Sequence, residues 1–281
     1  MAERMVSIDG IEICTESFGD PSDPPVLLMM GVAGSMLWWD EAFCAMLAAR
    51  GRHVIRYDPR DTGRSTTYEV GRPGYGGADL VADAAGVLDG YGIPAAHVVG
   101  VSAGGALAQV LAIDHPDRVL SLVLISTSSA AGTDRSPLPG PSEELSSFWT
   151  RPQPDWADLG AVADHLVAYV RVLTGGRRPF DEPSARELVR RDMERARSYP
   201  AVQNHELLEG AKPSRPVSAI SAPTLVVHGT ADPMFPPAHG EALASAIPGA
   251  RLLLLEDAGH GVEPADWETL AGAIADHTAR S

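Results

Sequence analysis

The amino-acid sequence predicts an α/β protein whose mostly parallel, doubly wound sheet carries an inserted helical cap. Compact apolar runs alternate along the chain with helical patterns, the order typical of parallel strands joined by crossover helices. Several runs are apolar throughout, as expected of strands covered on both faces. The alternation stops in one stretch that is rich in proline, glycine and serine and then helical. We therefore expect a core at residues 1–130 and 219–281 and a cap at residues 131–218.

The expected strands start with a hairpin over residues 5–18, because Asp9-Gly10 is a strong two-residue turn signal. Buried strands are expected at the compact apolar runs, at residues 26–30, 53–57, 97–101, 120–125, 224–227 and 252–255. Helices are expected where apolar residues recur every three or four positions, at residues 39–47, 80–91, 107–111 and 267–274. In the cap, residues 159–170 show the same spacing. Ser184 and Glu187 there predict a capping box for a second helix, and residues 206–208 a third.

The composition is that of an ordinary globular protein with an acidic surface. Hydrophobic residues make up 44% and charged residues 21%, and the formal net charge is -15. Such a charge repels nucleic acid and anionic membranes, so neither is an expected partner, whereas a homo-oligomer stays open. The chain shows no apolar stretch of the length of a signal peptide or a membrane span, and a cytoplasmic location is expected.

Cys14 and Cys44 are the two cysteines, and no cysteine or histidine cluster has the spacing of metal ligands. A disulfide framework is excluded by number, although one bridge is not. We expect free thiols packed as small hydrophobic groups. Neither a metal ion nor a cofactor is expected.

A candidate nucleophile lies where an expected strand ends and an expected helix begins, in Gly100-Val101-Ser102-Ala103-Gly104. A serine at such a turn is held on a strained backbone that lifts its hydroxyl above the sheet. Glycines flank it because a side chain at either position would crowd the turn. Ser102 is therefore the expected nucleophile.

A serine hydroxyl is a weak nucleophile and needs a base to take its proton. Asp232 and His260 follow the two later strands, in the chain order serine, acid, histidine. We expect His260 to act as base and then as acid, and Asp232 to orient its imidazole. Asp257 is the alternative acid. The other histidines considered, which are His165, His205, His228 and His239, are expected at the surface, as turn support, or at most in contact with substrate.

The tetrahedral intermediate needs hydrogen-bond donors for its oxyanion. The backbone N–H of Ala103 follows the nucleophile directly and lies at a helix N-terminus, where anions are favoured. A second donor is expected in the turn Gly31-Val32-Ala33-Gly34 after the first buried strand, at the N–H of Val32.

The combined motifs resemble the α/β-hydrolase superfamily over residues 5–130 and 219–281. The sequences HVIRYDPRDTGRSTT and AHVVGVSAGGALAQVLAIDHPDR, with Met30 before Gly31, are similar to bacterial anthracycline methylesterases of the aclacinomycin methylesterase type. Many superfamily members carry a histidine where Met30 stands, and Met30 agrees with this subgroup. The resemblance implies an α/β-hydrolase fold and a small-molecule ester substrate, such as a polyketide methyl ester. It also implies the triad Ser102, Asp232 and His260.

The expected function is a cofactor-independent, serine-dependent carboxylic ester hydrolase. A C–C bond hydrolase, a thioesterase or a perhydrolase could use the same triad, and a ligand-binding receptor could retain it. Ser102 argues against a dehalogenase or epoxide hydrolase, which use aspartate at this turn. The acidic charge argues against an interfacial lipase. Residues expected to line an apolar substrate pocket are Met30, Trp38, Trp39, Trp149 and Phe235.

Overall fold

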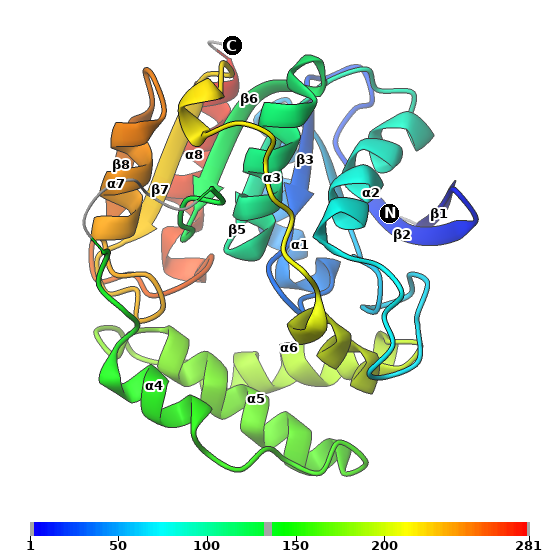
Figure 1. Ribbon diagram of the computed structural model, residues 1–281, viewed down its shortest axis with the longest axis vertical. Coiled ribbons are helices and arrows are strands. Elements are labelled where there is room, and N and C mark those ends of the chain that lie inside the picture. The colour runs from blue at the N-terminus through cyan, green and yellow to red at the C-terminus, as the bar shows by residue number, and fades with distance from the viewer. Residues whose placement is uncertain (1–2, 132–136, 280–281) are drawn as a thin grey trace.

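A twisted eight-stranded sheet forms the centre of the molecule in the computed structural model, which describes residues 3–131 and 137–279 (Figure 1). The strand order is β1-β2-β4-β3-β5-β6-β7-β8. β1 pairs antiparallel with β2, β2 pairs antiparallel with β4, and all later neighbours are parallel. The strands are β1 Arg4–Ile8, β2 Ile11–Phe18, β3 Pro25–Met29, β4 His53–Tyr57, β5 Ala96–Val101, β6 Val119–Ile125, β7 Thr224–Gly229 and β8 Arg251–Leu255. The predicted hairpin, the positions of the strands and the α/β fold class are confirmed. The expected burial of residues 252–255 is wrong, because β8 is the edge strand of the sheet and Leu252 and Leu254 are 37% and 42% exposed.

Helices cover both faces of this sheet. The core on one face joins side chains of α2, α3 and α7, and the core on the other joins those of α1 and α8. Burial on both faces explains why the inner strands lack polar alternation. These helices are α1 Glu41–Ala48, α2 Gly77–Gly90, α3 Ala103–Asp114, α7 Ala238–Ala246 and α8 Trp267–Thr278. Short 3-10 turns are η1 Met36–Trp38, η2 Pro116–Arg118, η4 Val217–Ala219 and η5 Pro264–Asp266.

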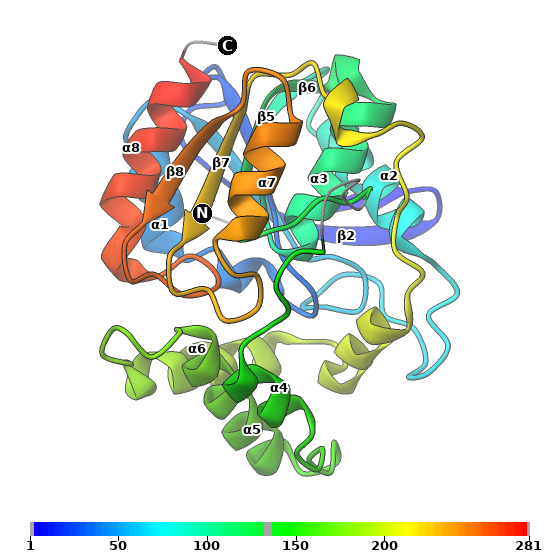
Figure 2. The same ribbon diagram turned by 60° about the vertical axis from the view of Figure 1, so that its left-hand side comes forward.

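Between β6 and β7 the chain forms a separate helical layer below the carboxyl ends of the strands (Figures 1 and 2). It consists of α4 Glu143–Trp149, α5 Leu159–Leu173, α6 Glu182–Arg195 and the 3-10 segment η3 Tyr199–Leu207. We propose that this layer is the cap expected at residues 131–218. Residues 132–136 of that range lie outside the described residues.

Two local predictions for the cap need correction. The second cap helix begins at Glu182, with Asp181 as its N-cap, so the capping box of Ser184 and Glu187 is wrong. The Asp181 side chain accepts hydrogen bonds from the backbone N–H and the hydroxyl of Ser184, and Pro183 supports the first turn. The third cap helix, expected around residues 206–208, is a 3-10 segment that starts at Tyr199.

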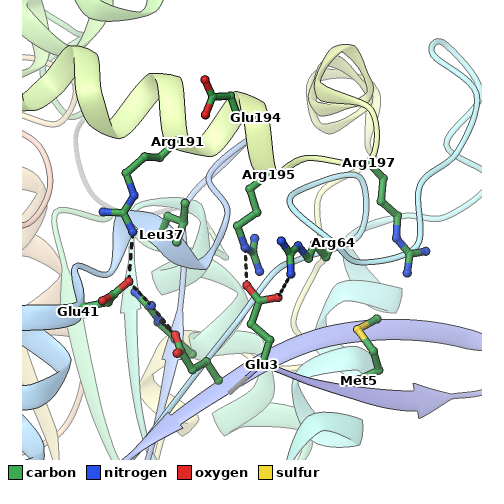
Figure 3. A pocket seen from close by; sticks show the side chains of 11 residues that line it. Glu3, Met5, Leu37, Glu41, Arg64, Arg191, Glu194, Arg195 and Arg197 are labelled. Atoms are coloured by element: carbon green, nitrogen blue, oxygen red, sulfur yellow. Dashed lines mark hydrogen bonds and ion pairs between the residues drawn. The ribbon is translucent and has the colours of Figure 1, made fainter. Parts of the chain in front are cut away.

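Charged side chains line a surface groove of about 1030 Å³ between α6 and the first strands (Figure 3). Arg195 of α6 forms ion pairs with Glu3 at 2.7 Å and with Asp58 at 2.8 Å, and Arg64 also pairs with Glu3. Arg191 reaches Glu41 at 3.1 Å. The groove contains no residue of the expected triad, and its ion pairs join the end of α6 to the core.

Cys14 and Cys44 are both free and buried, as expected. Burial raises the pKa of each thiol to about 12, so both stay protonated and unreactive at neutral pH. Among the described residues, no helix has both the length and the apolar character that a bilayer crossing requires.

A buried carboxyl group lies at the contact between α6 and the core. Asp192 is 2% exposed, and its Oδ2 accepts a hydrogen bond from Trp38 Nε1 at 2.9 Å. Burial raises the pKa of Asp192 to about 6, although the hydrogen bonds from Ser35 and Trp38 act in the opposite direction and lower it. The folded protein therefore holds the proton of Asp192 more tightly than the unfolded chain does. Ionisation of this group weakens folding as the pH rises through about 6.

Replacing Asp192 with asparagine keeps an acceptor for Trp38 and removes the titration. We expect Asp192→Asn to raise the free energy of unfolding at pH 7.5 by about 1–3 kcal/mol, since each pKa unit is worth about 1.4 kcal/mol. The gain should shrink toward zero near pH 4, where the wild-type carboxyl is protonated in the folded state. Urea unfolding of both proteins at several pH values measures this difference in the free energy of unfolding. An equal difference at pH 4 and pH 7.5 would contradict this account.

Candidate active site

Ser102 lies in the sharp turn between β5 and α3, as expected. Its backbone has φ 54° and ψ -122°, a region that side chains rarely adopt, and its side chain does not cap α3. Two contacts hold the strained residue in place. Its N–H donates to the carbonyl of Ile125 at 2.9 Å, and its own carbonyl accepts from Thr127 Oγ1 at 2.8 Å.

The flanking glycines are required by close packing of backbone. A Cβ on Gly100 would lie 2.5 Å from the carbonyl oxygen of Gly104, and one on Gly104 would lie 2.3 Å from that of Met29. Both contacts are with backbone atoms, so a side chain at either position would force the backbone to shift. The start of α3 therefore lies against the end of β3, which brings Ser102 to the turn that follows β3.

His260 and Asp232 meet at the same edge of the sheet. His260 Nδ1 lies 2.9 Å from Asp232 Oδ2, and the Asp232 side chain is fully buried. Asp232 Oδ1 accepts hydrogen bonds from the backbone N–H groups of Met234 and Phe235, at 2.8 and 2.9 Å. Burial by itself would raise the pKa of Asp232. The hydrogen bond and charge of His260, with the Phe235 N–H, outweigh it and hold this pKa below its ordinary value. Asp232 is thus a carboxylate at neutral pH.

Strand register brings the two loops close to Ser102. Val101 pairs with Ile125, Ile125 with Val227, and Gly229 with Leu255, so the carboxyl ends of β5 to β8 are aligned. The N–H of Gly261 donates to Ser126 Oγ, directly after β6, at 3.3 Å. Within residues 3–131 and 137–279, no hydrogen bond joins Ser102 Oγ to His260. Such contacts are often loose before substrate binds.

The structure separates the two candidate acids. Asp257 is exposed, and its N–H donates to Thr230 Oγ1 at 2.8 Å, as expected of a loop residue. Among the described residues, the carboxylate that contacts His260 is that of Asp232.

The other histidines have structural surroundings. His228 is fully buried at the end of β7, and its Nε2 donates to the Phe235 carbonyl at 2.7 Å, so it supports the turn that holds Asp232. Burial lowers the pKa of His228 and keeps it neutral. His239 lies on α7 and contacts Ser128 Oγ. His165 packs against Phe148 within the helical layer.

His205 departs from the expected surface position. It is 7% exposed, and its Nδ1 accepts a hydrogen bond from the Ala33 N–H at 3.0 Å. Because η3 folds back against the core, a cap residue contacts the turn expected to bind the oxyanion. No sequence pattern linked His205 to a residue 172 positions earlier.

A small cavity of about 40 Å³ lies next to the turn after β3 and the first residue of α3, and Ser102 itself does not line it. Both expected oxyanion donors, Val32 and Ala103, line it. Gly31 packs against the nucleophile, since a Cβ on Gly31 would lie 3.2 Å from Ser102 Cβ. The remaining lining residues are mostly apolar, and they are Met30, Gly31, Tyr57, Pro59, Leu80, Leu107, His205 and Leu208.

The expected pocket residues divide into three groups. Met30 lines this cavity, and the Phe235 ring lies 5.7 Å from the His260 ring. Trp38 and Trp149 belong to the region of the helical layer: Trp38 binds Asp192 there, and Trp149 at the end of α4 is 47% exposed. The assignment of Trp39 to the pocket is wrong, because Trp39 is fully buried in the core and stacks on Phe43 of α1.

No group of three or more metal-ligating side chains occurs among the described residues. The chemical groups that the structure places at this edge of the sheet are a serine hydroxyl, a histidine paired with a buried carboxylate, and backbone N–H groups. Such a set is suited to attack on a carbonyl group.

The backbone strain at Ser102 can be measured as a difference in the free energy of unfolding between two variants. Glycine adopts this backbone conformation without cost, whereas alanine keeps the strain of about 1–3 kcal/mol. Glycine also gains entropy in the unfolded chain, which offsets part of the benefit. We expect Ser102→Gly to unfold at a higher denaturant concentration than Ser102→Ala, with a difference of about 1 kcal/mol. Equal stability of the two variants would show that this turn is unstrained.

Comparison with known proteins agrees with this architecture. The family model described as alpha/beta hydrolase fold matches residues 24–168 and 169–262. The chain is 35% identical to a rhodomycin D methylesterase of Streptomyces peucetius, with 99% of this chain and 98% of that protein covered. It is 36% identical to the rhodomycin D methylesterase of Streptomyces sp. (strain C5), with the same coverage.

A solved structure shows the same fold. The enol-lactonase from Burkholderia xenovorans LB400 superimposes with a TM-score of 0.73 and 24% identity, and the match covers 98% of this chain and 100% of that chain. At that identity the likeness concerns the fold alone. The match of the family model to most of the chain, with full-length relatives above 30% identity, shows that this protein belongs to the alpha/beta hydrolase fold family.

Proposed function

We propose that this protein is a serine-dependent hydrolase of small-molecule carboxylic esters that needs no cofactor. One observation carries the proposal. A buried carboxylate, Asp232, binds the imidazole of His260 at the same sheet edge as the strained serine, Ser102. Two full-length relatives that are methylesterases support the ester as substrate class.

In the proposed reaction, Ser102 Oγ attacks the ester carbonyl carbon while His260 Nε2 takes its proton. Nε2 is the nitrogen that Asp232 leaves free. The oxyanion that forms accepts hydrogen bonds from the N–H groups of Val32 and Ala103, which line one cavity. Collapse of the intermediate breaks the carbon–oxygen bond, and the alcohol leaves with the proton from His260. Water then attacks the acyl-enzyme with His260 as base, which releases the acid and restores Ser102.

We further propose a polyketide methyl ester as the natural substrate. Both full-length relatives are named rhodomycin D methylesterases, which supports a methyl ester, and the resemblance to anthracycline methylesterases supports a polyketide as its acyl part. The cavity of about 40 Å³ beside the oxyanion donors has room for one small group, such as a methyl group. The proposal extends to a cytoplasmic location without nucleic-acid or membrane partners, which the net charge of -15 supports.

Removal of the nucleophile and of the acid tests the mechanism. Ser102→Ala should lower the turnover of p-nitrophenyl acetate about 10⁶-fold. In Asp232→Asn, the two backbone N–H groups at Oδ1 should hold the amide oxygen, which turns the NH₂ group toward His260 Nδ1. The imidazole is then held in the wrong tautomer, and we expect kcat to fall about 10⁴-fold.

Asp257→Asn is the matched control for the acid, because Asp257 is exposed and does not contact His260. It should retain wild-type kcat. Wild-type activity in Ser102→Ala, or equal losses in the two aspartate variants, would overturn the assignment of the triad.

Substrate class is tested with a panel of compounds that share one bulky aromatic acyl group. We expect the methyl ester to be hydrolysed with release of one methanol per acid, and kcat/KM to fall for longer alkyl esters because the cavity beside the donors is small. The matching thioester and a β-diketone complete the panel. Faster cleavage of the thioester or of a C–C bond would replace the ester proposal. Binding of the methyl ester without turnover would favour a receptor.

A further inference from the structure

His205 connects the helical layer to the turn that bears a proposed oxyanion donor. It lies in η3, the segment by which the chain returns from the layer to the sheet. Its Nδ1 accepts from the Ala33 N–H at 3.0 Å, and its Nε2 lies 2.7 Å from the Arg60 carbonyl oxygen. The imidazole thus bridges the turn after β3 and the turn after β4.

These two partners determine the protonation of the ring. The N–H of Ala33 can only donate, and the carbonyl of Arg60 can only accept. His205 must therefore be neutral, with its proton on Nε2. Burial lowers the pKa of His205 and favours this neutral form.

The bridge acts on the peptide group next to the proposed donor. The Val32 N–H belongs to the peptide that joins Gly31 to Val32, and the Ala33 N–H bound by His205 belongs to the next peptide. Fixing this next peptide limits rotation about the Val32 backbone. Gly31 packs against Ser102. Ala33 has φ 59°, an unfavourable value for alanine that must be held by its surroundings. The hydrogen bond to His205 supplies such a constraint.

His205 is itself firmly placed. The neighbouring Asn204 is fully buried, accepts from the Gly71 N–H at 2.7 Å and donates to Asp61 Oδ2 at 2.9 Å. His205 also lines the cavity of about 40 Å³ together with Val32 and Ala103. A rigid donor or acceptor gives its partner a defined direction, which is the condition for stabilising a transition state without reorganisation.

We propose that His205 is a positioning residue, whose neutral imidazole orients the Val32–Ala33 peptide so that the Val32 N–H faces the oxyanion formed at Ser102. The inference rests on the proposed function, because it assigns a task to that reaction. It makes the oxyanion site dependent on the helical layer, although the triad and both proposed donors belong to the core. An effect on the transition state should follow, with little effect on substrate binding.

The test compares His205→Leu with His205→Gln. Leucine leaves the Ala33 N–H unpaired, whereas glutamine offers one acceptor and one donor. We expect His205→Leu to lower kcat about 10- to 100-fold. This decrease should not exceed the decrease in kcat that follows removal of a whole oxyanion donor, which is about 100- to 1000-fold. KM should change less than about twofold, and His205→Gln should recover most of the activity.

Phenylboronic acid provides a readout that a structural role would not move. Ser102 Oγ adds to the trigonal boron, its proton passes to His260, and the tetrahedral anion mimics the transition state. The affinity of His205→Leu for this probe should fall in parallel with kcat. His97→Leu is the matched control, since His97 is buried, binds Ser121 Oγ at 2.8 Å and lies near the start of β5. It should lower thermal stability and leave kcat within about twofold.

Unchanged kcat and boronate affinity in His205→Leu would overturn the inference, as would a change in KM alone.

If His205→Leu does not fold, the inference is tested on the wild-type protein. With isotope-labelled histidine, nuclear magnetic resonance should show the His205 proton on Nε2. A proton on Nδ1 would overturn the proposal. Ser102→Ala is assayed in parallel. If it stays active, the proposed function fails; if it is inactive while His205→Leu is normal, the inference alone fails.

Discussion

The close approach of backbone at the Ser102 turn is the constraint on which the rest of the site depends. The start of α3 lies against the end of β3, at a distance that leaves no room for a Cβ on Gly104. That contact holds the half-buried serine on a strained backbone and places Ala103 beside the turn after β3. Hydrogen bonds from the Ser102 N–H to Ile125 and from Thr127 to the Ser102 carbonyl then tie the turn to β6.

Two buried carboxyl groups show how the same fold sets opposite charge states. Asp232 is buried with His260 and two backbone N–H groups as partners, and these partners hold its pKa low despite burial. Asp192 is buried with the neutral donors Ser35 and Trp38 close to it, and burial raises its pKa to about 6. The difference lies in the partners, because charge and hydrogen-bond donors favour the ionised form while burial opposes it. One carboxyl can thus orient a histidine, while the other holds α6 against η1.

The helical layer takes part in the proposed chemistry through contacts with the core. Ion pairs of Arg195 with Glu3 and Asp58 fix the end of α6, and Asn204 fixes η3 to Asp61. His205 extends this docking to the turn that contains Val32. Because these contacts fix the helical layer to the core, the layer can determine both the shape of the cavity of about 40 Å³ and the direction of the Val32 N–H.

The sequence by itself determined the fold class, the strands, most helices and the chain order of Ser102, Asp232 and His260, because apolar periodicity and glycine spacing are local signals. It favoured Asp232 and left Asp257 as an alternative, since both follow late strands, and it misplaced Trp39, whose apolar character suits a pocket and a core equally. Tertiary structure decided these points through strand register and packing: aligned carboxyl ends bring Asp232 to His260. It also placed His205 on the Ala33 N–H, a contact between residues 172 positions apart, which no local pattern encodes.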